Sequence, residues 1–224
     1  MDRFVEANQF YRDGKYAEAA KVYEELIKSK PMAEVYYNLA NAYFKEKKLG
    51  LAILNYERAR RLQPRDSDVL ANLAYASRLI EYKIEDKRNW YLRKKSELLQ
   101  FVTLAECWVV ALGVYLIFIA YVLISLTLKQ QSVFGKAGAL LLTLSMLASV
   151  PLFLKYGELK TGRMAIVTEG QAEVRYGPSA NDRIAFRLVE GFPVSLKDER
   201  KDWYRIQLND GRVGWAAQSQ VTPI

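Results

Sequence analysis

The chain reads CWVVALGVYLIFIAYVLISLTL from Cys107 to Leu128, a run of 22 residues without a charge. A helix of this length, at about 1.5 Å per residue, would span about 33 Å, and the hydrocarbon core of a bilayer is about 30 Å thick. A second uncharged run extends from Ala137 to Leu154. The two runs predict membrane-spanning helices over residues 101–128 and 133–156.

Only a short polar stretch, residues 129–132, separates the two runs. A connection this short makes the helices antiparallel, so the parts before and after the hairpin lie on the same side of the membrane. Glu106 and Lys136 lie near the ends of the spans, and we expect them to anchor the helices at the interface. The alternative is a buried hairpin in a soluble protein, although core helices are usually shorter and carry a polar face.

The composition argues against an enzyme. The 224 residues include no histidine, which is the commonest general base and a frequent metal ligand. The only cysteine, Cys107, lies in the first apolar run, so neither an intramolecular disulfide nor a cysteine metal cluster is expected. There is also no glycine-rich phosphate loop. We expect a non-catalytic protein without a cofactor or a metal.

The net charge of +8 has a local source. Five basic residues directly precede the first span and are expected to meet anionic lipid headgroups: Lys87, Arg88, Arg93, Lys94 and Lys95. We therefore expect a charged amphipathic helix over residues 86–100 at the membrane surface, and no nucleic-acid partner. A solvated charged helix face is the alternative.

The N-terminal part repeats itself at an offset of 33 residues. The matched pairs are Ala7 and Ala40, Phe10 and Tyr43, Ala19 and Ala52, Tyr23 and Tyr56, Leu26 and Ala59, and Pro31 and Pro64. Small residues allow close helix approach, aromatic residues fill the gaps and proline stops a helix, so each unit predicts two antiparallel helices. We expect two repeats over residues 1–64. A capping helix over 65–85, with Asp66 or Ser67 as its N-cap, would close the array.

These positions resemble the tetratricopeptide family. The resemblance implies a concave groove that binds peptide segments of partner proteins and is lined by the first helix of each unit: Asn8, Tyr11, Arg12, Tyr37, Asn41, Phe44, Lys45, Tyr75 and Arg78. Family members that clamp a C-terminal carboxylate use basic residues where this chain has Phe4, Asp68 and Asn72. This departure argues against a ligand of that kind.

Beyond residue 162 the apolar pattern changes to a period of two. Tyr204, Ile206 and Leu208 alternate with Trp203, Arg205 and Gln207, and the turn Asn209–Gly211 follows. Five short strands, at residues 165–167, 173–175, 194–196, 203–208 and 213–217, can be recognised in about 60 residues. They predict a small closed or nearly closed all-β barrel over residues 162–224.

This part resembles the bacterial SH3 family, most specifically in the segment Asp210–Trp215. The resemblance implies binding to attached proteins or to cell-wall peptide, with peptidoglycan as a candidate ligand. Tyr176, Trp203 and Trp215 are the aromatic candidates for such a surface. Tryptophan in so small a barrel is also a frequent core residue.

The sequence thus predicts a multidomain membrane protein: an all-α tetratricopeptide helical repeat, a two-helix transmembrane hairpin and a small all-β SH3-like barrel. This order resembles the BatE family of aerotolerance membrane proteins. The resemblance implies a scaffold that works with other Bat-type membrane proteins and a MoxR-type ATPase in the response to envelope stress. The alternative is a membrane sensor that relays ligand binding to a cytoplasmic partner.

The orientation in the membrane has two interpretations. Basic residues are more numerous beside the domains than in the loop between the spans, which places both domains in the cytoplasm. The family resemblance places them in the periplasm, on the bacterial inner membrane, and implies an export signal that residues 1–12 do not show. We favour the periplasmic arrangement and keep the cytoplasmic one as the alternative.

Overall fold

The computed structural model describes residues 3–81, 87, 89–128, 135–161 and 163–224. It forms two compact units, one made of Met1–Arg93 with Gly162–Ile224 and the other of Lys94–Thr161. The expected headgroup residue Arg88 and the polar stretch 129–132 lie outside the described residues. The repeats and the C-terminal domain therefore belong to one unit, although the apolar hairpin separates them in the sequence.

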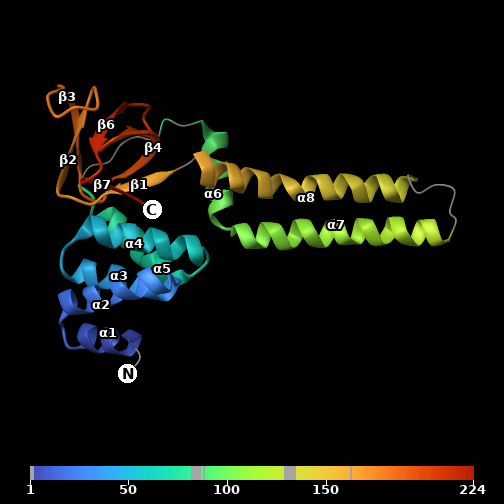
Figure 1. Cartoon of the computed structure of the whole chain (residues 1–224), viewed down its shortest axis with the longest axis horizontal. Helices are drawn as coiled ribbons and strands as arrows, with labels where there is room; N and C mark the ends of the chain where they lie inside the picture. The colour runs from blue at the N-terminus through green and yellow to red at the C-terminus, as the bar shows by residue number, and fades with distance from the viewer. Residues whose placement is uncertain (1–2, 82–86, 88, 129–134, 162) are drawn as a thin grey trace. The chain divides into compact units, whose positions relative to one another are not determined.

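Helices build the N-terminal part of the first unit, in the order α1 (Arg3–Arg12), α2 (Tyr16–Ser29), α3 (Ala33–Lys45), α4 (Leu49–Leu62) and α5 (Ser67–Arg78) (Figure 1). The four alanines that the repeat alignment pairs are all fully buried: Ala7, Ala19, Ala40 and Ala52. Small side chains at these positions let neighbouring helices approach closely. The helical repeat predicted from the sequence is confirmed.

Both repeats begin and end their second helix in the same way. The turn before it contains a residue in the left-handed region, Gly14 with φ of 75° in the first repeat and Lys47 with φ of 63° in the second. The helix then ends two residues before Pro31 or Pro64. Proline disfavours helical backbone in the preceding residue, so it limits each repeat to its length.

The fifth helix packs on α4 and has a well-formed N-terminus. The side chain of Asp66 accepts hydrogen bonds from the backbone N–H groups of Asp68 and Val69, at 2.9 and 3.1 Å. Of the two expected N-caps, Asp66 is therefore the one used. Helix α5 ends at Arg78, and a separate helix, α6 (Trp90–Gln100), follows beyond the segment left out of the description.

The C-terminal part is an antiparallel sheet of seven strands in the order β3-β2-β6-β5-β4-β1-β7. The strands are β1 (Met164–Val167), β2 (Gln171–Arg175), β3 (Ile184–Val189), β4 (Pro193–Arg200), β5 (Trp203–Gln207), β6 (Val213–Ala217) and β7 (Val221–Pro223). The sequence predicted five strands and missed β3 and β7. Strand β3 begins with two apolar residues and a phenylalanine in succession, and β7 has only three residues, so neither shows clear alternation.

The hairpin between β5 and β6 forms at the predicted turn. Gly211 has φ of 95°, a conformation that glycine adopts without strain. The backbone N–H of Leu208 donates to the carbonyl oxygen of Arg212 at 2.9 Å, which closes the turn. The fold class predicted for this domain, a small all-β domain, is confirmed.

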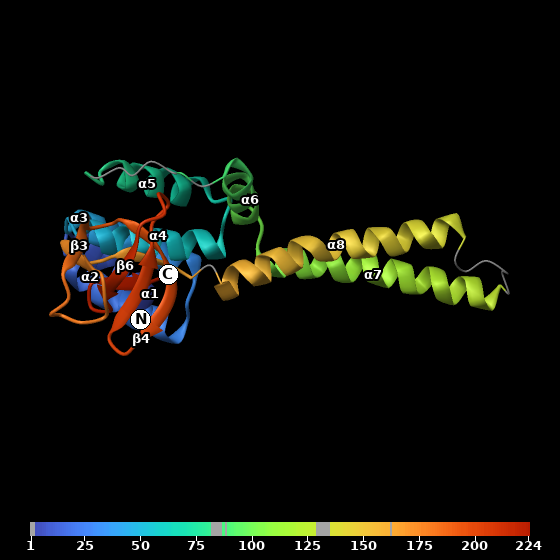
Figure 2. The same ribbon diagram turned by 90° about the horizontal axis from the view of Figure 1, so that it is seen from above.

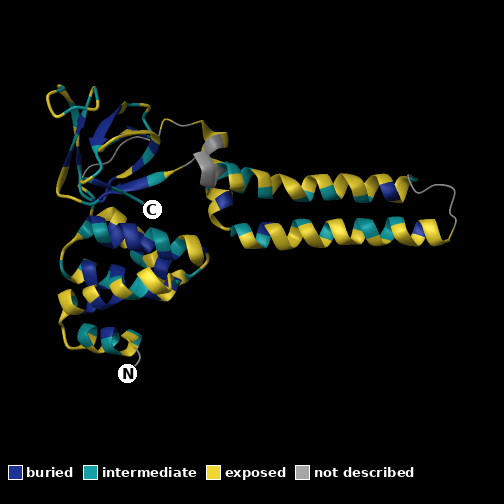
Figure 3. Ribbon diagram, in the orientation of Figure 1, coloured by how far each residue is buried: buried dark blue, intermediate teal, exposed yellow. Residues whose placement is uncertain are grey.

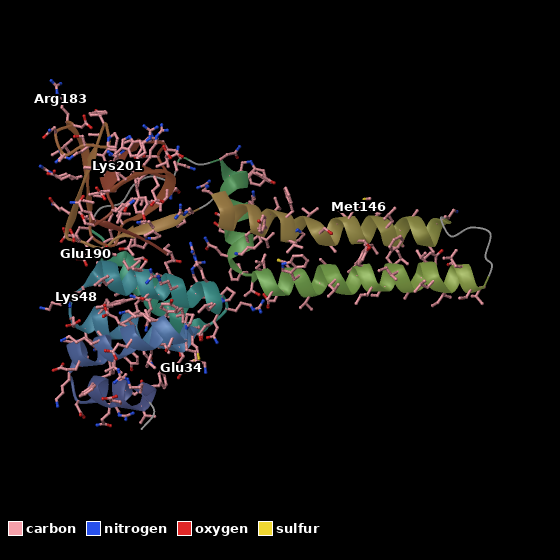
Figure 4. The ribbon with its side chains drawn as sticks, viewed as in Figure 1. Glu34, Lys48, Met146, Arg183, Glu190 and Lys201 are labelled. Carbon is pink, nitrogen blue, oxygen red and sulfur yellow. The ribbon has the colours of Figure 1, made fainter. Side chains whose placement is uncertain are left out.

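The sheet packs against α4 through a very close backbone contact. The backbone N–H of Gly50 donates to Oε1 of Glu190 at 2.7 Å. A Cβ atom on Gly50 would lie only 2.4 Å from the carbonyl oxygen of Val167. The first turn of α4 contains no acidic residue, so Glu190 supplies the negative charge that a helix N-terminus favours. Figure 4 labels Glu190 on the side of the sheet that faces the start of α4, close to Lys48.

Apolar side chains continue this contact. Ile166 of β1 is buried within the core of the repeats, and Ile80 packs against both the repeat core and the sheet core. Gly191 has φ of 82°, and a Cβ atom there would lie 2.8 Å from Cδ1 of Ile53. The two cores therefore meet without a polar layer between them.

Arginines complete the contact toward the C-terminal end of α4. The guanidinium of Arg58 donates to the carbonyl oxygen of Pro223 at 2.9 Å, and that of Arg61 donates to the carbonyl oxygen of Ile224 at 2.6 Å. Burial lowers the pKa of Arg58, although the neighbouring Tyr36 acts in the opposite direction. Strand β7 is thus held to the helix by charged hydrogen bonds.

The two repeats differ in sequence where the sheet packs. The first repeat has Ala17 and Ala20 at the positions that Gly50 and Ile53 occupy in the second. Glycine removes the side chain at the point of closest approach, and isoleucine adds apolar surface beside it. Only α4 is adapted to receive the sheet, and α4 is consequently buried on more sides than α2.

The second unit contains two long apolar helices, α7 (Leu104–Thr127) and α8 (Lys136–Thr161), which run side by side in both ribbon views (Figures 1 and 2). Most of their apolar side chains are exposed (Figure 3), for example Val109 at 71% and Phe153 at 77%. Both helices are long and apolar enough to cross a membrane. Such exposure differs from that of a core helix of a soluble protein, which is mostly buried.

The ends of these helices differ from the predicted boundaries of the spans. Helix α7 begins at Leu104, because Thr103 and Glu106 form a capping box: the Thr103 hydroxyl accepts from the Glu106 N–H and the Glu106 carboxylate accepts from the Thr103 N–H. Glu106 thus has a capping role in addition to the expected anchoring one. Helix α8 continues beyond Tyr156 and contains Pro151 in its interior.

Candidate functional site

A hydrogen-bonded ladder of tyrosines and asparagines joins the helices of the repeats. In the first repeat, the Tyr23 hydroxyl donates to Oδ1 of Asn8 at 2.5 Å. Nδ2 of Asn38, on the first helix of the next repeat, donates to the same oxygen at 3.3 Å. One asparagine oxygen therefore connects three helices.

The second repeat copies this arrangement. The Tyr56 hydroxyl donates to Oδ1 of Asn41 at 2.5 Å, and Nδ2 of Asn72 donates to that oxygen at 3.2 Å. Asn72 also donates to the Tyr37 hydroxyl at 3.0 Å. Because the same residue types recur at nearly the same offset, the ladder is a property of the repeat.

The two hydroxyl donors of the ladder, Tyr23 and Tyr56, stay protonated over the physiological pH range. Burial, the largest cause, raises the pKa of Tyr23 to about 12. Burial and the neighbouring Tyr37 and Tyr11 also raise the pKa of Tyr56. Neutral hydroxyls can donate hydrogen bonds, so the geometry of the asparagines is preserved at neutral pH.

The second copy of the ladder forms one wall of a pocket of about 360 Å³ between α1, α3, α4 and α5. It is lined by Tyr11, Tyr37, Asn41, Phe44, Lys45, Tyr56, Asn72 and Tyr75. Ring contacts hold the walls in place: the centroids of Phe44 and Tyr75 are 5.8 Å apart, and those of Tyr37 and Tyr56 are 6.0 Å apart. The pocket therefore has a largely aromatic, preorganised surface.

Six of the nine residues predicted to line the groove do line this pocket: Tyr11, Tyr37, Asn41, Phe44, Lys45 and Tyr75. Asn8 belongs to the first copy of the ladder, while Arg12 and Arg78 are exposed in the last turns of α1 and α5.

Sequence reasoning missed two lining residues, Tyr56 and Asn72. Tyr56 was assigned only to packing between helices, because it lies on the second helix of its repeat. Asn72 was interpreted as the counterpart of Asn38 in the capping helix and as a departure from a carboxylate clamp, but not as a lining residue. The 34-residue spacing between Asn38 and Asn72 was the available signal for its role.

The chemistry of the pocket is that of binding. Its eight lining residues include neither a carboxylate nor a histidine nor a cysteine, and their ionisable groups are four tyrosines and Lys45. Within the described part of the chain, no cluster of three or more acidic or cysteine side chains could hold a metal ion. Aromatic rings, two amides and one ammonium group are suited to holding a peptide segment.

The three aromatic residues expected on the surface of the C-terminal domain have different environments. Tyr176 is 73% exposed, and Trp203 is half-buried. Trp215 is buried, with the guanidinium of Arg200 at 5.3 Å from its ring centroid. The expectation that Trp215 offers an open surface is wrong, because its ring is buried and the guanidinium of Arg200 from β4 lies over it. Tyr176 and Trp203 remain available to a ligand.

The basic residues before the hairpin lie on or near α6. Lys87, Arg93 and Lys94 are exposed, and Lys95 is half-buried. Lys94 also pairs with Glu97 at 2.8 Å. The same helix begins with two exposed aromatic residues, Trp90 and Tyr91, which are residue types enriched at membrane interfaces.

Comparison with known families gives two matches. Residues 4–67 match the tetratricopeptide repeat family, and residues 168–223 match the bacterial SH3 domain family. No curated protein matches the chain. The protein thus combines a repeat domain of a type that binds other proteins, a domain of a type that binds cell wall or protein, and two helices apolar enough to anchor it in a membrane. Both domain types are typically non-catalytic interaction modules.

Proposed function

We propose that the protein is a non-catalytic, membrane-anchored scaffold. The repeats capture a segment of a partner protein, and the SH3-type domain binds cell wall or a second protein through the surface around Tyr176 and Trp203. The single observation that carries this proposal is the preorganised aromatic pocket in the repeats. A pocket with this lining recognises side chains and backbone without transforming them.

The domain order extends the proposal to a particular assembly. It is the order of the BatE family, so the partners would be other Bat-type membrane proteins and a MoxR-type ATPase, acting in the response to envelope stress. Both domains would face the periplasm of the bacterial inner membrane. The basic residues on and before α6 would meet anionic lipid headgroups, with Trp90 and Tyr91 at the same interface.

Co-purification from membranes tests the scaffold. Tyr75 is 57% exposed and lines the pocket, so Tyr75→Ala removes contact surface without opening the core. We expect the tagged Tyr75→Ala chain to lose most of its Bat-type partners. Val5→Ala, at an exposed apolar position of α1 outside the pocket, is the matched control and should retain them. Equal recovery of partners with Tyr75→Ala would contradict the assignment of the groove.

Thiol labelling tests the orientation. Single cysteines are placed in the two domains as Ser29→Cys and Asn209→Cys in a Cys107→Ala background, and intact spheroplasts are treated with a membrane-impermeant reagent. Labelling at both sites is expected for periplasmic domains. Protection of both sites until lysis would place the domains in the cytoplasm and direct the search for partners there.

A further inference from the structure

Lys45, which lines the pocket, belongs to a row of three basic residues. Arg12, Lys45 and Arg78 follow one another at intervals of 33 residues, and they lie in the last turns of α1, α3 and α5. All three are exposed. Because these helices are the equivalent elements of successive repeats, the row follows the stacking direction of the repeats.

The basic charges of the row exceed the opposing charges beside them. Each helix C-terminus carries a partial charge of about −0.5, so three termini offset about half of three cations. Two acidic residues follow the row: Asp13 accepts at 2.7 Å from the neutral amide of Gln9 and so keeps one negative charge beside Arg12, whereas Glu46 pairs with Lys48 at 3.2 Å. Among the described residues, no ion pair involves Lys45 or Arg78. The row therefore keeps a net positive charge.

The ladder leaves hydrogen-bonding groups of two amides unused in the pocket. Oδ1 of Asn41 accepts two hydrogen bonds, and Nδ2 of Asn72 donates two. In the described part of the chain, neither Nδ2 of Asn41 nor Oδ1 of Asn72 has a hydrogen-bond partner. One donor and one acceptor side by side match the C=O and N–H groups of an extended peptide, whereas a helical ligand has satisfied its own backbone.

We propose that the groove selects an extended, acidic segment of its partner, with carboxylate side chains on the Arg12–Lys45–Arg78 row and an apolar side chain in the pocket. The inference rests on the proposed function and names the chemistry of its ligand. The acidic groups are internal side chains, so a free C-terminus is not required. The pocket volume of about 360 Å³ is within the range of ligand sites and suits a single side chain with its adjoining backbone.

Peptide binding to the full chain in detergent tests this selectivity. The probes are fluorescent nonapeptides that alternate glutamate with phenylalanine, blocked at both ends, and a matched set with glutamine in place of glutamate. Anisotropy should show tighter binding of the glutamate peptide, and added salt should remove most of the difference. An exposed ion pair is worth about two- to fivefold in affinity, so Lys45→Gln and Arg78→Gln should each weaken the glutamate peptide by that factor.

The glutamine peptide serves as an internal control, because its affinity should not respond to either substitution. Lys21→Gln, an exposed position of α2 outside the pocket, should leave both peptides unchanged. Equal affinities for the two peptides, or tighter binding of a single-stranded thymidine oligonucleotide, would overturn the inference. If Tyr75→Ala still abolishes partner capture in that case, the scaffold function stands and only the acidic selectivity fails.

Discussion

Replacing Gly50 by alanine sets two physical effects against each other. Glycine inside a helix costs about 1 kcal/mol relative to alanine, so propensity alone predicts that Gly50→Ala stabilises the protein by that amount. The structure predicts the opposite sign. The new Cβ atom would lie 2.4 Å from the carbonyl oxygen of Val167 and 2.8 Å from Cγ of Glu190. The glutamate side chain can move, but the strand backbone cannot do so cheaply.

The expected change in the free energy of unfolding depends on which contacts of Gly50 are lost. Overpacking of a close contact costs about 1–3 kcal/mol, and loss of a hydrogen bond to a charged group costs about 1.5–3 kcal/mol. Moving the sheet away from α4 relieves the first cost but weakens the bond from Gly50 to Glu190. After subtraction of the propensity gain, we expect Gly50→Ala to destabilise the first unit by about 1–3 kcal/mol.

Urea unfolding of the full chain in detergent measures this change. Trp203 and Trp215 both lie in the sheet, so in a Trp90→Phe and Trp108→Phe background the fluorescence reports on the domain that the substitution does not alter chemically. The urea concentration at the midpoint of the fluorescence change should be lower for Gly50→Ala than for the unmodified chain. The control is Ala17→Gly at the equivalent exposed position of α2, where only helix propensity acts and about 1 kcal/mol should be lost. Stabilisation by Gly50→Ala, or an unchanged fluorescence midpoint, would refute the close packing of sheet and helix.

Three further predictions concern the repeats. Lys47→Gly should stabilise the protein by about 1 kcal/mol in a urea titration, because Lys47 holds the left-handed conformation that Gly14 holds in the first repeat; a loss of stability would contradict this. Asn55→Val should stabilise the protein by about 1 kcal/mol and raise the thermal midpoint, because it removes a buried Oδ1 that has no hydrogen-bond partner among the described residues. Valine is the chosen replacement because Val22 occupies the equivalent position of the first repeat. A lower midpoint would show that the amide is needed. The contribution of Tyr23 to the free energy of unfolding should be fully present below about pH 10 and be lost as the pH rises through about 12, because folding raises the pKa of Tyr23. Tyr23→Phe should be less stable at neutral pH but lose stability less steeply as the pH rises. An equally steep loss would exclude Tyr23 as a cause.

Much of the fold could be predicted from local patterns. The paired alanines and prolines define the repeats, because close helix packing and helix termination depend on single residue types at a fixed spacing. The same spacing placed most of the pocket, since equivalent residues of stacked helices share one face. The two missing lining residues, Tyr56 and Asn72, act through side chains that reach across helices, and such contacts depend on how the helices stack.

The C-terminal domain shows the limit of alternation as a signal. Strands β5 and β6 alternate clearly and were found, whereas β3 was missed because its apolar residues are consecutive. Trp215 was both a surface candidate and a candidate core residue in the sequence, and the structure decides for burial. Its position on the strand is that of an outward-facing residue, and the guanidinium of Arg200, which comes from β4 two strands away, lies over the ring.

Local sequence by itself determined the helical repeats, the two apolar helices and the β character of the C-terminal domain, because period, charge and turn residues act over short distances along the chain. Only the tertiary structure decided that the repeats and the sheet form one unit. Gly50 and Glu190 are separated by 140 residues and by both apolar helices, yet they share a hydrogen bond of 2.7 Å. Glycine normally destabilises a helix. Gly50 is favourable here because a strand from the far end of the chain occupies the space that a side chain would fill.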